Sequence, residues 1–326
     1  MKNNTCFTSC FAPYMEAFIS EKKSLGFKYD TEGRILHHFD RYCLEHCHGP
    51  VFDEKLVQDY IFADENRSVK TKQNIIGLMR QFASYLTRQG LKAWMFPPEL
   101  FPKKEQVYQP YIFTHNEISD IMQTAEKLTI NPEFPTRYKT LPLLYRTLYC
   151  CGLRVSEATN LTLEKVDLHS GMLFICNAKN YRDRVIPLSE ELTAKYKVYR
   201  RDVHANSTPD DFFFKSDYGN SYCTQAVEAC FRELLWKCGI SYGGRLKGPH
   251  LHCLRHTFSV HCLQKAMKEG RELQEFLPVL SAYLGHKTLQ GTEKYLHMTA
   301  ELYPDILDTL EEYCIGIIPK SGDRHE

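Results

Sequence analysis

The stretch 284–298, LGHKTLQGTEKYLHM, places His286 directly after a glycine and Tyr295 nine residues further on. The residues between them are polar and typical of a loop, and a helix-like segment, 301–313, follows. This pattern predicts an exposed tyrosine held at a fixed distance from a histidine on a glycine turn. A tyrosine that only fills a core needs no such arrangement. The role of this histidine and tyrosine therefore has to be inferred from the rest of the chain.

The composition is that of an ordinary globular protein. The chain has 326 residues, of which 43% are hydrophobic and 25% charged, enough for two domains with separate cores. No apolar run approaches the ~20 residues of a membrane span, and the N-terminus lacks a signal-peptide pattern. We therefore expect a cytoplasmic protein. The net charge of +1 gives no overall signal for nucleic acid, although a basic stripe on one face would be enough to bind DNA.

The 13 cysteines favour reduced thiols over a disulfide framework, because they are odd in number and scattered through helix-like and strand-like segments. The cluster CLEHCH, with Cys43, His46, Cys47 and His48, suggests zinc. However, no second ligand pair follows at zinc-finger spacing, and the two cysteines fall on one helical face. We expect neither a metal nor a cofactor.

The sequence predicts two domains, 1–105 and 106–326. Four amphipathic segments in the first domain predict a helical bundle, with Thr31 as the N-cap of the second helix. Gly26 and Gly90 are placed as helix ends.

A proline-rich stretch, 96–113, marks the domain boundary, because proline removes a backbone donor and interrupts helices. Directly after it, Thr114 and Glu117 have the spacing of a capping box. The second domain is predicted to be mostly helical, with two short strands at 172–177 and 184–188. The expected fold class is therefore mainly α with a small β-sheet.

Two basic segments of the second domain are candidates for phosphate binding. In YCCGLRVSEATNL, 149–161, Arg154 could direct its guanidinium into a cleft, and Glu157, one helical turn away, could orient it. An exposed arginine–glutamate pair on a helix is the alternative. In NAKNYRDR, 177–184, Lys179, Arg182 and Arg184 lie at the tip of a hairpin, where a solvated turn is the alternative.

A third segment, HLHCLRHTF at 250–258, places His252 and Arg255 on one face near a helix start. Arginine can neutralise an anionic substrate while histidine moves a proton. His252 and His256 also have the spacing of metal ligands, but Arg255 would repel a cation and no zincin-type glutamate follows. Tyr295 is a poor nucleophile unless cations stabilise its phenolate, and the segments above supply such cations.

Taken together, Arg154 in GLRVSE, Lys179 in the hairpin, HCLRH, and LGH followed by Tyr295 resemble the tyrosine recombinase (phage integrase) family. The resemblance covers about 106–300 at the level of motifs, and the N-terminal bundle is similar to the family's SAM-like core-binding domain. The segment KNYRDRVIPL also resembles the strand that leaves the family's catalytic hairpin, which favours Lys179 over Lys165 as the catalytic lysine.

The resemblance implies a catalytic mechanism. Tyr295 would attack a scissile phosphate and form a 3′-phosphotyrosine bond, while Arg154 and Arg255 hold the non-bridging oxygens. Lys179 would protonate the leaving 5′-oxygen, His252 would manage the tyrosine proton, and His286 would donate a hydrogen bond to the phosphate. Glu157 would hold the arginines in place.

The resemblance also implies partners. Strand exchange between two double-stranded DNA sites passes through a four-way (Holliday) junction and needs four protomers, with the C-terminal tail docking on a neighbour. Integration, excision, transposition and dimer resolution all remain open, as do accessory DNA-bending or directionality factors.

The alternatives are a type IB topoisomerase-like enzyme that rejoins the original strand, or a DNA-binding regulator with an idle site. The residues predicted to position DNA are Lys70, Lys72, Arg80, Arg182, Arg245 and Lys247.

Overall fold

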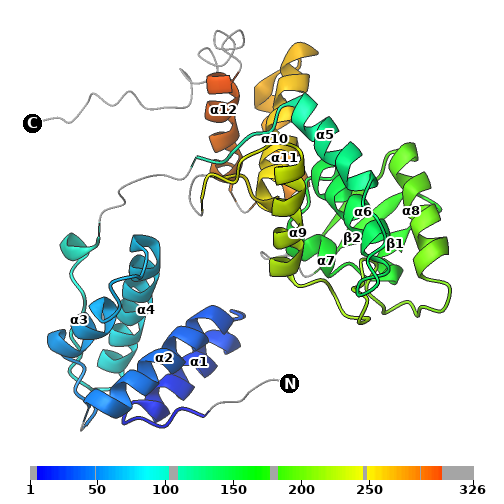
Figure 1. Ribbon diagram of the computed structural model, residues 1–326. Coiled ribbons are helices and arrows are strands. Elements are labelled where there is room, and N and C mark those ends of the chain that lie inside the picture. Colours follow the sequence, from blue (N-terminus) through cyan, green and yellow to red (C-terminus); the bar gives the residue numbers. More distant parts are fainter. Residues whose placement is uncertain are drawn as a thin grey trace, which may run out of the picture. The chain divides into compact units, whose positions relative to one another are not determined.

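A computed structural model describes residues 6–47, 49–102, 109–176, 183–244, 248–286 and 288–302. The chain divides into two compact units, Met1–Val107 and Tyr108–Glu326. Figure 1 shows both, the first in blue to cyan and the second in green to orange. None of the described helices is long and apolar enough to cross a membrane.

The first unit is built on four helices, α1 (Ala12–Ser24), α2 (Asp30–His46), α3 (Glu54–Phe62) and α4 (Val69–Arg88), followed by the short 3-10 helix η1 (Pro98–Leu100). Its core is strongly aromatic, with Phe11, Phe18, Phe39, Phe52 and Phe82 all buried and in mutual ring contact. Burial of such large rings supplies most of the hydrophobic stabilisation that a small bundle needs.

Helix ends in this unit follow local capping chemistry, with one correction to the sequence prediction. Asp53 and Ser68 accept hydrogen bonds from the backbone at the starts of α3 and α4, and α1 ends just before Gly26 at φ +86°. The predicted N-cap at Thr31 was wrong. Tyr29, at φ 52°, precedes α2, and Asp30 lies in its first turn, where a carboxylate favours the positive end of the helix dipole.

The second unit is mostly helical with a small sheet. Its helices are α5 (His115–Glu126), α6 (Arg137–Cys150), α7 (Val155–Thr159), η2 (Leu163–Lys165), α8 (Glu190–Val203), α9 (Thr224–Lys237), α10 (Leu251–Lys268), α11 (Leu273–Leu284) and α12 (Gln290–Leu302). The mainly α fold class with a small sheet is confirmed. The capping box of Thr114 and Glu117 at the start of α5 is also confirmed.

The sheet is antiparallel in the order β1-β2-β3, with β1 (Val166–Asp167), β2 (Met172–Ile175) and β3 (Arg184–Pro187). The sequence pattern did not predict β1, because two residues are too few to show alternation. Leu173 pairs with Ile186, and both side chains are buried in the core of the unit. This pairing fixes Arg184 at the first position of β3.

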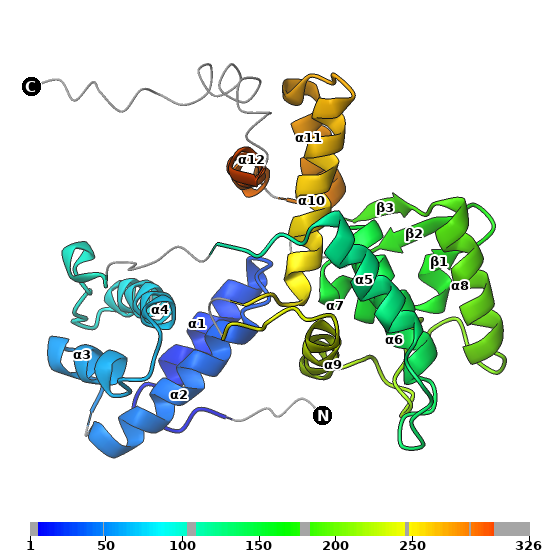
Figure 2. The same cartoon turned by 45° about the horizontal axis from the view of Figure 1, so that its top comes forward.

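Helix α10 is central to the second unit, and it packs against α6, α11 and α12. Figure 2 views α12 nearly along its axis, beside α10 and α11. A separate apolar cluster joins these three helices, with Val260, Leu277, Leu284 and Tyr295 among its buried members. The unit therefore brings together residues that are far apart in the chain.

The segment around Tyr295 differs from the sequence prediction. A helix begins at Gln290, so the loop between His286 and Tyr295 is much shorter than expected. The sequence predicted an exposed Tyr295, but its side chain is only 1% exposed, because this face of α12 packs on α10 and α11. The predicted tail helix within 303–313 lies outside the described residues.

Candidate active site

Arg154 is positioned by the start of a short helix. It is the N-cap residue of α7, and Glu157 closes a capping box by accepting from the Arg154 backbone N–H at 2.9 Å. The same carboxylate accepts from Arg154 Nη1 at 2.6 Å. The side chain of Glu157 is only 4% exposed, so this is a buried ion pair, and the alternative of an exposed helix pair does not describe it.

Two further arginines meet Glu157. Arg184 donates from Nη1 and Nη2 to the two carboxylate oxygens, at 3.2 and 2.8 Å. Arg255 Nη1 lies 3.9 Å from Glu157 Oε2. Burial by itself would raise the pKa of Glu157, but Arg184 and Arg154 lower it to about 2. Three guanidinium groups around one carboxylate leave a formal excess of two positive charges.

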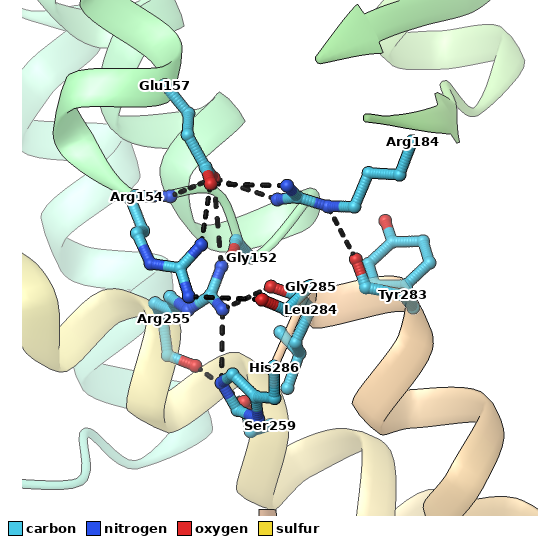
Figure 3. A network of polar contacts seen from close by, with 10 residues as sticks. All are labelled: Gly152, Arg154, Glu157, Arg184, Arg255, Ser259, Tyr283, Leu284, Gly285 and His286. Atoms are coloured by element: carbon cyan, nitrogen blue, oxygen red, sulfur yellow. Dashed lines mark hydrogen bonds and ion pairs between the residues drawn. The ribbon is translucent and has the colours of Figure 1, made fainter. Parts of the chain in front are cut away.

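The end of α11 holds the same three arginines from the opposite side (Figure 3). Tyr283 O accepts from Arg184 Nε at 2.8 Å, Leu284 O from Arg255 Nη2 at 2.6 Å, and Gly285 O from Arg154 Nη2 at 3.5 Å. Carbonyls at a helix C-terminus have no intrahelical partner and carry the negative end of the helix dipole. Three consecutive carbonyls therefore stabilise cations that one carboxylate cannot neutralise.

Two glycines make this close approach possible. Gly152, at φ +58°, accepts from Arg255 Nη1 at 2.6 Å, and a Cβ there would lie 2.4 Å from a carbon of the Phe258 ring. Gly285, at φ +65°, ends α11, and a Cβ there would lie 3.1 Å from Arg184 Nη1. A side chain at either position would strain the backbone and displace a neighbour.

The three arginines differ in access. The side chain of Arg154 is 18% exposed, that of Arg184 9% and that of Arg255 1%. Burial, and then the charge of Arg154, lower the pKa of Arg255 to about 10. An anion that approaches from solvent would therefore meet Arg154 first.

His286 joins the arginine cluster from the turn after α11. Its Nε2 lies 3.2 Å from Arg255 Nη2, and its Nδ1 lies 2.8 Å from Thr292 Oγ1. A guanidinium can only donate, so Nε2 accepts and the proton sits on Nδ1. Burial, and then Arg255 and Arg154, lower the pKa of His286 to about 4. The ring of His286 stacks on Tyr295 with centroids 6.3 Å apart.

The Tyr295 hydroxyl lies 3.0 Å from His256 Nδ1. The ammonium of the adjacent residue, Lys294, lies 4.9 Å from the centre of the Tyr295 ring. Burial raises the pKa of Tyr295, while Arg255 opposes that rise. The sequence motifs assign no role to either His256 or Lys294. The sequence does contain one indication of His256, because residues 252, 256 and 259 are spaced so that they share one face of α10.

His252 lies beside this pair. Its ring meets the His256 ring edge-on, with centroids 4.6 Å apart. Burial, and then Arg255, lower the pKa of His252 to about 3. The part of the chain that the structure describes holds no group of three or more metal-ligating side chains.

The structure describes only some of the residues that were predicted to position DNA. Lys70 and Lys72 lie in the first turn of α4, and the Lys72 ammonium lies 5.6 Å from the Phe62 ring centre. Arg80 donates to Phe96 O and stacks on Phe101 at 5.8 Å, so it also holds its own unit together. The catalytic candidate Lys179 and the DNA candidates Arg182, Arg245 and Lys247 lie outside the described residues.

Known proteins resemble this chain in both sequence and fold. A sequence model of the phage integrase family matches residues 112–301, more than half of the chain. The integrase/recombinase y4rB of Sinorhizobium fredii is 27% identical over 93% of this chain and 98% of its own. Tyrosine recombinase XerD of Pseudomonas putida is 27% identical, over 88% of this chain and 90% of its own.

A solved structure agrees with these relatives at the level of the fold. A lambda integrase dimer bound to a COC′ core site covers 87% of this chain and 94% of its own, with a TM-score of 0.62 and 14% identity. The chain therefore belongs to the phage integrase family, whose class is that of the tyrosine-type site-specific recombinases. The family resemblance predicted from the motifs is confirmed.

Proposed function

We propose that the protein cuts and rejoins double-stranded DNA at specific recombination sites, through a covalent 3′-phosphotyrosine bond on Tyr295. The observation that supports this most is the excess of positive charge held by Arg154, Arg184 and Arg255 around Glu157, next to a tyrosine hydroxyl. A buried cluster with that charge needs an anion, and a DNA phosphodiester would supply one.

In the proposed reaction, Arg154 and Arg255 bind the non-bridging oxygens and stabilise the charge of the pentacoordinate transition state. Arg154 is the first contact because it is the most exposed of the cluster. His286 donates to the phosphate only after Nε2 has gained a proton, because in the DNA-free protein this nitrogen accepts from Arg255. Lys179 protonates the leaving 5′-oxygen, and His252 is the residue that the family resemblance assigns to the tyrosine proton.

The phosphotyrosine bond conserves the energy of the broken phosphodiester, so rejoining requires no ATP. The positive charge that the transition state needs comes from the protein's own side chains, so activity should survive a chelator such as EDTA. If a 5′-hydroxyl from a second duplex attacks the intermediate, strands are exchanged.

The assembly and its location extend this proposal. Exchange between two duplexes takes four protomers on DNA, and docking of the C-terminal tail onto a neighbour would link them.

The candidate contacts to the DNA backbone are Lys70, Lys72 and Arg80 on α4, together with Arg182, Arg245 and Lys247. DNA affinity should then fall as salt rises. We place the working protein in the cytoplasm, bound to the nucleoid.

A trapping experiment tests the covalent step and finds the target DNA sequence at the same time. The protein is incubated with a pool of nicked duplexes that carry a random central segment, and adducts that resist SDS are isolated and amplified. The nick lets the short 5′-hydroxyl strand diffuse away, so the adduct accumulates. The enriched sequence, here called the selected duplex, is then used in all further assays.

The wild-type protein and Tyr149→Phe, a control at a different tyrosine of the second unit that is partly buried, should form the adduct, with or without EDTA. Tyr295→Phe should form none. The proposal is wrong if the wild type forms no adduct, or if the adduct persists in Tyr295→Phe.

The topoisomerase-like alternative is favoured by one observation, the placement of Tyr295 against the arginine cluster of its own chain. Two supercoiled plasmids that carry the selected duplex distinguish the alternatives. A recombinase yields joined products, whereas relaxation without joined products would indicate the topoisomerase-like enzyme.

A further inference from the structure

The hydroxyl of Tyr295 meets a histidine other than the one that the family motif indicates. His256 lies on α10, is 5% exposed, and has its Nδ1 3.0 Å from the Tyr295 oxygen. The two rings are tilted at 53° with centroids 5.5 Å apart. This is a hydrogen bond of ordinary length between a buried imidazole and the reacting atom of the proposed nucleophile.

We propose that His256 orients the Tyr295 hydroxyl and accepts its proton as the phenolic oxygen attacks the scissile phosphorus. The inference rests on the proposed function and adds a catalytic residue to it. In this arrangement the phenol donates to Nδ1, and the imidazole carries its own proton on Nε2.

The atoms of the step balance as follows. The Tyr295 oxygen forms a bond to phosphorus, the bond from phosphorus to the 5′-oxygen breaks, and the phenolic proton moves to His256 Nδ1. The 5′-oxygen takes a proton from the acid proposed above, Lys179. In rejoining, a 5′-hydroxyl attacks phosphorus and returns its proton to Lys179. The bond from phosphorus to the tyrosine oxygen breaks, and His256 returns its proton to that oxygen.

The surroundings of His256 keep it neutral before DNA arrives, which a proton acceptor requires. Burial lowers the pKa of His256 to about 2, and nearby charged or titratable groups add to this effect: His250, His252, Arg255 and Lys294. Burial also raises the pKa of Tyr295. The proton therefore stays on the phenol in the DNA-free protein, and premature ionisation of the nucleophile is disfavoured.

Proton transfer becomes favourable only during the attack. As the phenolic oxygen bonds to phosphorus it becomes an ester oxygen, which has almost no affinity for a proton. The phosphate also brings negative charge among Arg154, Arg255 and Lys294, which offsets their repulsion of an imidazolium. General base catalysis of this kind requires a hydrogen bond in place at the start of the step rather than a previously ionised nucleophile.

His252 is less well placed for this role. Its ring lies edge-on against His256, on the preceding turn of α10. Its pKa is lowered by burial and then by Arg255, which faces the arginine cluster. We assign His252 to the phosphate side of the site, where it can hydrogen-bond an oxygen of the DNA backbone.

The chain offers a matched control on the same helix. His261 is also buried, and its Nδ1 lies 2.9 Å from the Tyr149 hydroxyl. His256→Asn and His261→Asn therefore remove the same kind of histidine–tyrosine pair from α10, one at the site and one away from it. Asparagine offers an amide group near the former Nδ1 but cannot accept a proton at neutral pH.

Single-turnover adduct formation on the selected duplex provides the test. We expect His256→Asn to be slower than wild type by about 10²- to 10⁴-fold, the usual contribution of a general base, with DNA binding retained. His261→Asn should react like wild type. Sulfur in place of the bridging 5′-oxygen removes the need for an acid, so it should accelerate a Lys179→Ala variant and leave His256→Asn slow.

The pH profile separates a proton acceptor from a structural residue. Between about pH 7 and pH 9 the rate of His256→Asn on the sulfur duplex should rise with pH, because hydroxide replaces the missing base, while the wild-type rate stays nearly flat. If His256→Asn fails to fold, as judged by thermal melting, His256→Gln takes its place in the same assays. If neither variant folds, a flat wild-type profile supports the proposal and a tenfold rise per pH unit overturns it.

Three results would overturn the inference: a His256 variant as fast as wild type, rescue of that variant by the bridging sulfur, or identical pH profiles for the variant and the wild type. A wild-type protein that forms no adduct contradicts the proposed function itself. The two failures are therefore distinguishable.

Discussion

On one side of the site, Arg154, Arg184 and Arg255 crowd around the carboxylate of Glu157; on the other, Tyr295 lies among histidines that burial keeps neutral. The first side, here called the cation side, stores positive charge before DNA arrives. The second, the nucleophile side, holds histidines that can accept or donate a proton but carry no charge at neutral pH.

The difference shows that the two sides are electrostatically coupled. Burial is the main cause that lowers the pKa of His286 and of His252, and the charge of Arg255 lowers both further. The excess charge that attracts a phosphate therefore also helps burial to keep the nearby imidazoles neutral. A bound phosphodiester would neutralise the excess positive charge and would also make it easier for the imidazoles to take up a proton. Phosphate binding and proton transfer are therefore linked through charge.

The largest expected effect comes from removing charge from the cation side. Arg255→Met should slow single-turnover adduct formation by about 10³-fold, because each preorganised group at the developing charge contributes roughly 10²–10³-fold and Arg255 also holds His286. Arg201→Met, at a side chain that is 74% exposed on α8, is the control. An Arg255→Met enzyme of near wild-type rate would show that the cation side does not hold the reacting phosphate.

Glu157→Gln tests the balance within the cation side. The substitution keeps the shape but leaves three buried guanidinium groups without a counter-charge, so the free energy of unfolding at neutral pH should fall by about 3 kcal/mol. Because the Glu157 pKa is lowered, its contribution is present above the unfolded pKa of about 4.3 and is lost as pH falls through about 2. Urea unfolding measures the change, with the exposed Glu233→Gln as control. An unchanged stability would mean that the α11 carbonyls alone stabilise the arginines.

The two sides also differ in how far sequence can predict them. The motifs that contain Arg154, Glu157, Arg255 and His286 predict a cluster only through their joint resemblance to the tyrosine recombinase family, because local spacing does not bring residues so far apart in the chain together. The backbone carbonyls of α11 that hold the arginines cannot be predicted, because they depend on which helix end packs there rather than on side-chain type.

On the nucleophile side, sequence identifies Tyr295 but not its surroundings. The polar residues after His286 are typical of a loop, yet they begin a helix whose apolar face packs on α10 and buries the tyrosine. The spacing of His256 suggests only a metal ligand paired with His252. Which of two histidines on adjacent turns meets a tyrosine on another helix depends on how the helices pack, and local periodicity does not contain that information.

Arg184 offers a smaller test of the cation side, because it binds Glu157 and Tyr283 O rather than facing solvent. We expect Arg184→Gln to disturb the position of Arg154 and of the start of β3. Adduct formation should therefore slow by about tenfold, which is close to the free energy of one charged hydrogen bond. DNA affinity should change little. Arg146→Gln, which breaks the partly exposed pair with Glu126, is the control. A loss confined to DNA affinity would instead indicate that Arg184 binds the phosphate directly.

The smallest effect, and the most direct test of the coupling, is acid destabilisation by the neutral histidines of the site. The pKa values of His252 and His286 are lowered to about 3 and about 4 in the folded protein. Their contribution to stability is therefore present above the unfolded pKa of about 6.5 and is lost progressively as pH falls below it, by at most about 1.4 kcal/mol per histidine and pH unit.

We expect thermal melting of the full chain to show a lower Tm at about pH 5.5 than at about pH 7.5, and His286→Asn to reduce that difference. Sulfate, which can occupy the cation side, should reduce it as well, because an anion among the arginines makes a protonated His286 less unfavourable. Chloride at equal ionic strength is the control for general screening. If sulfate and chloride have the same effect, the charges on the two sides act independently, and the proposed link between phosphate binding and proton transfer is wrong.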